Sequence, residues 1–483
     1  MVEEKRKLNP ISSDTYNERF KRLKSQPNLS MLDTINIKLL DFDFDKVCCI
    51  SSSSINVYCC LTCGKYLQGR LENTPAFIHS LNFNHRLFIN FQTLKIYILP
   101  DNTLFHDEGT ISVINEIRHL ISPTFEEEEI STFPKRCLSL NKKEYLTGFV
   151  NLNSTSDTSY ITTIVLAFAH ITPIRDYFLL KKDDVGDILK SPNLENKLGL
   201  LIRKIWSPQL AKPHISPNEL IDYLNIHQKS NNESTPSQQT VPLKNPTTFL
   251  LTLIHQLSKT SNNLKTILFE NLQGKIDIKS SSTVTKNIID QPVDDESKKK
   301  IKAKNKIVHT PFWLLKLELP SMPILKKGLK ADDIPRVKLG TLLSKYNGTV
   351  STHAAGNQLR SLKLKSLPNY LIIQYDRFKN NLHVNGIKNG FSVRNRNQTL
   401  IDYPMKMKLL NREYQLIMNI IHKSSSIPAL NNVNDIDDTS SWLIQINDET
   451  TDEWWEINER SVSRKEKQLL FLGEVFLQIW RAK

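Results

Sequence analysis

Residues 148–179 read G-F-V-N-L-N-S-T-S-D-T-S-Y-I-T-T-I-V-L-A-F-A-H-I-T-P-I-R-D-Y-F-L, and the interpretation of the whole chain starts from them. A Ser/Thr/Asp cluster at 154–159 precedes an apolar run from Tyr160 to Ile171. Such residues are common helix N-caps, so the cluster predicts a loop that leads into a buried helix. Pro173 is expected either to end that helix or to lie shortly before its end. The free N–H groups at a helix start can stabilise an oxyanion or lower the pKa of a thiol. The start of this helix is therefore a candidate catalytic position.

The stretch resembles the nucleophile region of the ubiquitin-specific proteases, where G-L-x-N-L-G-N-T-C-Y precedes a buried helix. Gly148, Asn151 and Leu152 match this pattern, but the cysteine has no match. An ungapped count places Ser156 at the cysteine position, whereas alignment on the helix places Ser159 there. We favour Ser159, because the helix anchors more of the match, and Ser156 is the alternative.

The other residues of the protease triad are also changed. The last of the six cysteines is Cys137, so no thiol exists at the nucleophile position. The resemblance places Ser441 where the proteases have their histidine base, and Asn458 where they have the residue that orients it. His422 lies in the preceding strand, where the family has a histidine that is not the base. Without nucleophile and base the chain is not expected to be an enzyme, and helix capping is the expected role of the two serines.

A metal site is predicted near the N-terminus from spacing alone. Cys60-x2-Cys63 is followed, after 15 residues, by His79-x5-His85, which is the spacing of a structural Cys2His2 zinc site. We expect the cysteines on a turn that uses Gly64, and the imidazoles on a following helix and its exit. One structural Zn²⁺ is therefore predicted. The remaining cysteines of this region are expected to be packing residues: Cys48, Cys49 and Cys59.

The same region resembles the zinc finger of the ubiquitin proteases, through residues 55–70, 76–85 and 94–102. In family members that bind ubiquitin, an arginine after the Cys-Gly pair and an aromatic pocket hold the ubiquitin C-terminus. Lys65 stands in place of that arginine, and Leu99 replaces one of the aromatic residues. Because lysine lacks the planar fork of arginine, the resemblance argues against ubiquitin as a partner of this finger.

The 483 residues divide into four parts in sequence. We expect a flexible arm at 1–30, the zinc finger at 31–122, an acidic linker at 123–139 and an inactive protease-like domain at 140–483. Stretches poor in apolar residues predict mobile insertions in that last domain, near 228–242 and 277–309. The fold class is α+β: a small α/β zinc-finger domain, then a papain-like domain with the thumb, palm and fingers of the ubiquitin-specific proteases.

Periodicity predicts the main elements of the second domain. Residues 245–257 are apolar at helical spacing and predict an amphipathic helix. Apolar runs with alternating polar breaks predict strands at 310–320, 367–378, 414–422, 440–446 and 453–458.

Composition limits where the protein acts. Lys+Arg of 64 against Asp+Glu of 50 gives a net charge of +14, which suits acidic surroundings such as ribonucleoprotein particles, although a solvated basic surface is the simpler reading. The N-terminus lacks the apolar region of a secretory signal, and no apolar run approaches the ~20 residues that span a bilayer. Cysteines crowded into 48–63 favour metal binding in a reducing compartment. We expect an intracellular, soluble protein.

A single-zinc finger followed by a protease domain without cysteine and histidine resembles the inactive protease-like splicing factors of the tri-snRNP. The stretches that carry this resemblance include 32–36, 40–48, 173–179 and 473–480. It implies a nuclear, non-catalytic scaffold that promotes assembly or maintenance of the U4/U6-U5 tri-snRNP through contacts with spliceosomal proteins, with small nuclear RNA touched at most indirectly. The alternatives are a ubiquitin-binding adaptor without catalysis and a hydrolase with a serine nucleophile.

Overall fold

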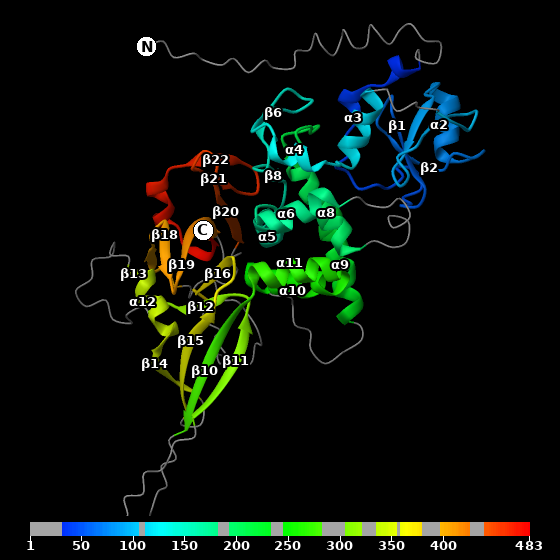
Figure 1. The fold of residues 1–483 in the computed structure, drawn as a ribbon. Coiled ribbons are helices and arrows are strands. Elements are labelled where there is room, and N and C mark those ends of the chain that lie inside the picture. The colour runs from blue at the N-terminus through cyan, green and yellow to red at the C-terminus, as the bar shows by residue number, and fades with distance from the viewer. Residues whose placement is uncertain are drawn as a thin grey trace, which may run out of the picture. The chain divides into compact units, whose positions relative to one another are not determined.

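The computed structural model describes residues 31–105, 112–181, 193–232, 245–282, 305–320, 335–354, 358–378, 397–425 and 439–483 (Figure 1). The predicted arm at 1–30 lies outside these residues. The chain forms two compact units. The first contains Met1–Thr147, Lys182–Asn196 and Trp206–Pro213, and the second contains Gly148–Lys181, Lys197–Ile205 and His214–Lys483.

The first unit is built on a five-stranded antiparallel sheet in the order β2-β1-β3-β4-β5. Its strands are β1 (Val57–Cys60), β2 (Tyr66–Gln68), β3 (Leu87–Asn90), β4 (Ile96–Ile98) and β5 (Thr103–Leu104). The first unit also contains the short 3-10 turns η1 (Leu32–Thr34) and η2 (Ile37–Leu39) and the helices α2 (Pro75–Phe83) and α3 (Ser112–Ile121). Helix α3 buries one apolar stripe in the core that it shares with the sheet: Val113, Ile114, Ile117 and Ile121.

The stretch predicted to be an acidic linker is folded, so that interpretation is wrong. It contains the helix α4 (Glu127–Ser131) and the strand β6 (Arg136–Leu138), which pairs with β7 (Glu144–Leu146). Glu126 and Glu129 form a capping box at the start of α4, with the Glu126 N–H donating to Glu129 Oε2 at 2.9 Å. The acidic run forms a helix start because carboxylates are favoured at the positive end of a helix.

The second unit begins with the helix that the opening stretch predicts. A 3-10 turn, η3 (Ser156–Thr158), leads directly into α5 (Ser159–Ala169), and every residue of α5 except Tyr160 is buried. The break between α5 and α6 (Thr172–Leu180) confirms the predicted helix end, with Pro173 in the first turn of α6. The next helices along the chain are α8 (Leu194–Ile205), α9 (Asn218–Asn232), α10 (Pro246–Thr260) and α11 (Asn262–Leu272). Helix α10 confirms the predicted amphipathic helix.

Two larger sheets complete the second unit. The four-stranded antiparallel sheet has the order β11-β10-β15-β14, from β10 (Gly274–Ser282), β11 (Asn305–Phe312), β14 (Asn347–Ala354) and β15 (Gln358–Ser366). The eight-stranded sheet has the order β12-β16-β23-β19-β20-β21-β22, with β18 also paired to β19. Its strands are β12 (Leu315–Glu318), β16 (Tyr370–Asp376), β18 (Lys406–Leu409), β19 (Arg412–Ser425), β20 (Thr439–Asp448), β21 (Glu453–Ile457), β22 (Val462–Lys465) and β23 (Val475–Ala482).

Smaller elements join these sheets: the parallel pair β8 (Asn151–Leu152) and β9 (His214–Ile215), the parallel pair β13 (Arg336–Lys338) and β17 (Leu400–Asp402), α12 (Leu339–Leu343) and the 3-10 turns η4 (Ser344–Tyr346) and η6 (Lys467–Leu472). The last four predicted strands are confirmed, as β16, β19, β20 and β21. The stretch predicted as one strand at 310–320 contains parts of two strands, because β11 ends at Phe312 and β12 begins at Leu315.

The predicted insertions are narrower than expected. Both ends of the stretch at 277–309 are strands, since β10 runs to Ser282 and β11 begins at Asn305. Helix α9 likewise continues to Asn232 within the stretch predicted at 228–242. The remaining residues of both stretches lie outside the described part of the chain. In the described part of the chain, no single helix is long and apolar enough to cross a bilayer. The segments Ser156–Ala169 and Thr172–Leu180 are long and apolar enough only when taken together, and they meet at a bend of 86°.

Candidate functional site

The four predicted metal ligands lie together in the first unit. Their ligand atoms are all within 4.8 Å of one another. Cys60 ends β1, Cys63 follows in the next turn, His79 lies on α2, and His85 follows the end of that helix. The structure therefore brings together residues from both halves of the predicted motif.

The cluster has the dimensions of a tetrahedral zinc site. Cys60 Sγ lies 3.5 Å from His85 Nδ1, Cys63 Sγ lies 3.4 Å from His79 Nε2, and the two ring nitrogens are 3.0 Å apart. Tetrahedral bonds of ~2.3 Å to sulfur and ~2.0 Å to nitrogen would place sulfur about 3.5 Å from nitrogen. The cluster can hold one zinc ion, and the predicted cofactor fits these residues.

Backbone geometry at Gly64 and Asn84 places the ligands. The Gly64 N–H donates to the Cys60 carbonyl at 2.8 Å, and Gly64 has a φ of +74°. A Cβ at this position would lie 2.3 Å from the Leu39 carbonyl oxygen, so only glycine fits the turn. At the end of α2, Asn84 adopts the left-handed conformation with φ of 53°, and this turns the chain before His85.

Burial controls protonation at the metal-free cluster. Desolvation raises the pKa of the Cys60 thiol to about 12, although the N–H groups of Cys63 and Thr62 partly stabilise its thiolate. Burial, with the nearby His85, lowers the pKa of His79, which favours the neutral ring that a metal requires. Zinc binding would therefore release thiol protons, because the metal charge replaces the missing hydration of the thiolate.

The other cysteines of this region differ in how deeply they are buried. Cys59 is completely buried, and Cys48 Sγ accepts from the Ile50 and Ser51 N–H groups at 3.5 and 3.4 Å. Cys49 is exposed, so the prediction that it packs in the core is wrong. Its place directly after the buried Cys48 puts it on the outer side of the turn.

The two positions that the resemblance assigns to ubiquitin capture differ in exposure. Leu99 is completely buried in a small core cluster of the finger. Lys65 is exposed, and its Nζ lies 5.6 Å from the centre of the Phe83 ring. Since Leu99 is a core residue here, it cannot offer a surface to a peptide tail.

In the second unit, Ser159 is the first residue of α5 and is completely buried. Its Oγ donates to the Ser156 carbonyl at 2.7 Å and accepts from the Trp442 main-chain N–H at 3.0 Å. Ser441, half-buried, directly precedes Trp442 on β20. A hydrogen bond thus joins the segment that carries Ser159 to the segment that carries Ser441.

The predicted capping role of the serines is wrong. Thr155 and Thr158 form the capping box at η3, and Thr158, the N-cap of α5, makes no side-chain capping bond. Asn458 also has a local role. Its Oδ1 accepts from Arg460 N and from the N–H and hydroxyl of Ser461 at 2.8–3.1 Å, within the turn between β21 and β22.

An aromatic cluster, which the sequence analysis missed, surrounds Trp442. The ring centres of His422 and Phe378 are 5.1 Å apart, those of His422 and Trp442 are 4.8 Å apart, and those of Trp442 and Phe476 are 4.9 Å apart. The cluster comes from strands far apart in sequence, and no local motif marks it. His170, half-buried, follows the other end of α5, about 16 Å along the helix from Ser159.

Replacing Cys63 with Ala should remove zinc from the protein and unfold the finger, because structural zinc stabilises such domains by ~10 kcal/mol or more. Cys49→Ala is the matched control, since Cys49 is an exposed cysteine of the same unit. Metal analysis should find one zinc per chain in wild type and control and none in Cys63→Ala. Wild-type protein without zinc, or a folded Cys63→Ala finger, would contradict the site.

Two family descriptions match the chain: "Zn-finger in ubiquitin-hydrolases and other protein" over residues 48–110 and "Ubiquitin carboxyl-terminal hydrolase" over residues 147–476. The pre-mRNA-splicing factor SAD1 of Saccharomyces cerevisiae is 34% identical over 96% of this chain and 96% of its own length. The probable mRNA-splicing protein ubp10 of Schizosaccharomyces pombe is 32% identical, over 93% and 87% of the two chains.

A solved structure supports the same assignment. The crystal structure of an essential yeast splicing factor is similar to this chain with a TM-score of 0.75 and 31% identity, over 94% of this chain and 100% of the other. The predicted α+β fold, with a zinc finger before a protease-like domain, is confirmed. The chain belongs to the ubiquitin carboxyl-terminal hydrolase family and carries the zinc finger found in ubiquitin hydrolases.

Proposed function

We propose that this protein is a non-catalytic member of its family that acts in pre-mRNA splicing. The observation that carries the non-catalytic part is the hydrogen bond from the Trp442 N–H to Ser159 Oγ, at 3.0 Å. A serine nucleophile needs a base to take its proton and free space in front of its oxygen. The Ser159 hydroxyl instead donates to a main-chain carbonyl, and its oxygen accepts from a main-chain amide.

The surroundings of Ser159 support the same conclusion. A serine, Ser441, occupies the position of the base, and no cysteine follows Cys137 in the sequence. The side-chain oxygen of Asn458 accepts a hydrogen bond from the Ser461 N–H and so stabilises its own turn. It does not orient a base. We infer that the triad positions have become structural.

The splicing role is supported by the relatives. Two of them, similar along almost their whole length, are named as splicing proteins, and the similar solved structure is described as a splicing factor. This similarity extends over both the finger and the protease-like domain. We therefore propose a nuclear protein with spliceosomal partners. More specifically, we propose a scaffold that promotes assembly or maintenance of the U4/U6-U5 tri-snRNP.

Ser159→Ala should destabilise the second unit by about 1–3 kcal/mol, because it leaves the buried Trp442 N–H without its acceptor. Ser156→Ala is the control, since only the main-chain carbonyl of Ser156 takes part in the bond described above. Chemical denaturation of the full chain should show a loss for Ser159→Ala and little change for Ser156→Ala. Equal stability of Ser159→Ala and wild type would argue against the structural role.

Depletion of the protein should lower the amount of tri-snRNP relative to U4/U6 and U5 particles and cause unspliced transcripts to accumulate. Gradient sedimentation with detection of the small nuclear RNAs measures the first effect, and transcript sequencing measures the second. A Ser441→Ala chain should restore both, because the proposed function needs no base, whereas Cys63→Ala should not. Unchanged splicing after depletion would refute the splicing role, and unchanged tri-snRNP with defective splicing would refute the scaffold role.

A further inference from the structure

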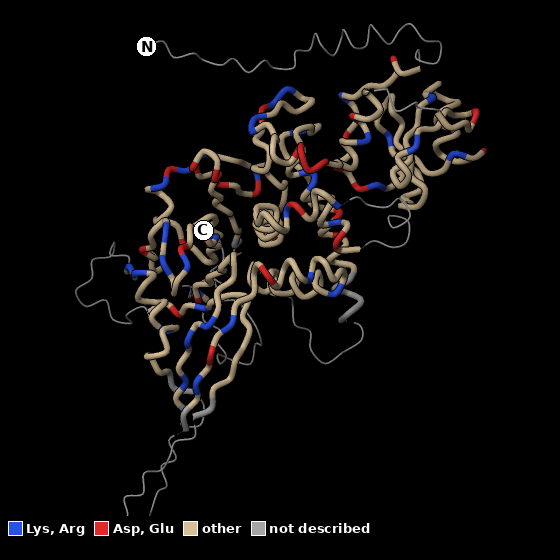
Figure 2. Tube along the Cα trace, viewed as in Figure 1, with Lys and Arg blue, Asp and Glu red and all other residues tan. Residues whose placement is uncertain are grey.

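The four-stranded sheet of the second unit has one face rich in lysine. Pairing in register places Asp277 of β10 opposite Lys363 of β15, and Lys275 and Lys279 flank Asp277 at alternate positions of the same strand. Alternate residues of a strand point to the same side, so these side chains share one face. Lys365, at the irregularity of β15, is exposed beside them. All four lysines are exposed, and Figure 2 shows basic residues recurring along these neighbouring strands.

The other face of this sheet packs against the core. Ile276 and Leu364, which pair across β10 and β15, are buried in the main core cluster, and Ile278, Leu362 and Phe312 pack against it. The alternation between these residues and the lysines fixes the orientation of the sheet. The lysine face is therefore held outward by the core.

The positive charge on this face is poorly compensated. The one carboxylate paired with these positions is Asp277, and His309 Nδ1 lies 2.5 Å from Asp277 Oδ1. Among the residues that the structure describes, none of the four lysines forms an ion pair with a carboxylate. Neighbouring like charges repel one another in the free protein, and a bound polyanion would remove this repulsion.

We propose that this face, defined by Lys275, Lys279, Lys363 and Lys365, binds the phosphate backbone of RNA. Lysines at alternate positions of a strand are about 7 Å apart. Such a regular row of positive charges suits a ligand with a regular row of phosphates better than it suits a ligand with one acidic side chain. Among the described strand positions on this face none is Phe, Tyr or Trp, and the imidazole of His309 is paired with Asp277. Binding should therefore depend on the backbone and on salt, and not on base sequence.

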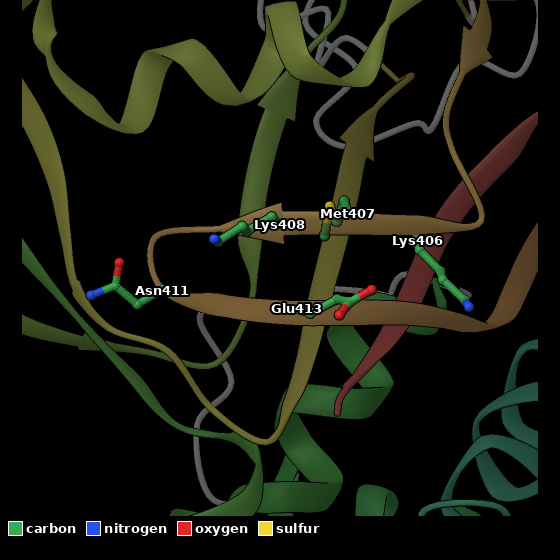
Figure 3. A pocket seen from close by; sticks show the side chains of 5 residues that line it. All are labelled: Lys406, Met407, Lys408, Asn411 and Glu413. Carbon is green, nitrogen blue, oxygen red and sulfur yellow. The ribbon is translucent and has the colours of Figure 1, made fainter.

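The β18–β19 hairpin of the same unit gives a matched comparison. Lys406 and Lys408 also lie at alternate positions of a strand and are exposed, beside a shallow pocket that Met407, Asn411 and Glu413 complete (Figure 3). There Glu413 pairs directly opposite Lys408. The pKa of the Asp452 carboxyl is lowered mainly by its hydrogen bond with Lys467, and the charge of Lys406 adds a weaker effect. Because carboxylates already face these two lysines, they should contribute little to RNA binding.

The test compares two full-length double variants with the same loss of charge, Lys279→Gln with Lys363→Gln and Lys406→Gln with Lys408→Gln. Fluorescence anisotropy should follow binding of a single-stranded oligouridine of about 20 nucleotides over a series of salt concentrations. The first variant should bind about tenfold more weakly at low salt, and the slope of log K against log salt should become shallower by about 1.4, since each phosphate contact contributes ~0.7. The second variant should match wild type within about twofold.

Equal effects of the two variants would overturn the proposal, because they would reflect net charge alone. An unchanged slope in the first variant would overturn it as well. An acidic peptide of Asp and Glu that binds more tightly than the RNA, with the same lysine dependence, would identify a protein-binding face instead. Circular dichroism of both variants excludes unfolding as the cause, since all four substitutions are at exposed positions. Splicing assays are independent of this test, so the proposed function and the RNA face can fail separately.

Discussion

The hydrogen bond between the Trp442 N–H and Ser159 Oγ joins the buried helix α5 to the eight-stranded sheet. It links residues that are 283 positions apart in the sequence, inside a region from which solvent is excluded. A buried main-chain N–H must have an acceptor, and the hydroxyl of Ser159 supplies it. The position that the resemblance assigns to the protease nucleophile thus connects the helix to the sheet. The aromatic cluster around Trp442 packs behind it.

Zinc has the corresponding role in the first unit. The finger has short strands and a small core, and the metal cluster connects the end of β1 to helix α2. A fold of this size gains stability from a metal that its apolar core alone does not provide. In each unit the stabilising interaction described here lies inside the fold, so the outer surface of the unit remains available for binding. Under the proposed non-catalytic function, selection on this family fold acts on those surfaces.

Local patterns predicted much of the fold, and contacts distant in sequence explain what was missed. The zinc ligands are all within 26 residues, so their spacing was sufficient, and the long apolar run of α5 was equally clear. The capping role assigned to Ser159 was wrong because its partner, Trp442, comes from a strand that no local pattern connects to it. The acidic run at Glu126 was misread because the same carboxylates suit both a linker and a helix start. The lysine face needed the register of β10 with β15, which composition does not contain.

The reaction of the full-length protein with ubiquitin that carries a C-terminal electrophile tests the central claim most directly. Such a probe bonds covalently to an activated serine or cysteine that lies where the ubiquitin tail ends. With Ser159 buried and hydrogen-bonded at both its hydrogen and its oxygen, the account predicts that intact-mass spectrometry finds no adduct on this protein, under conditions in which an active family member is fully modified. An adduct mapped to Ser159 or Ser156 would contradict it.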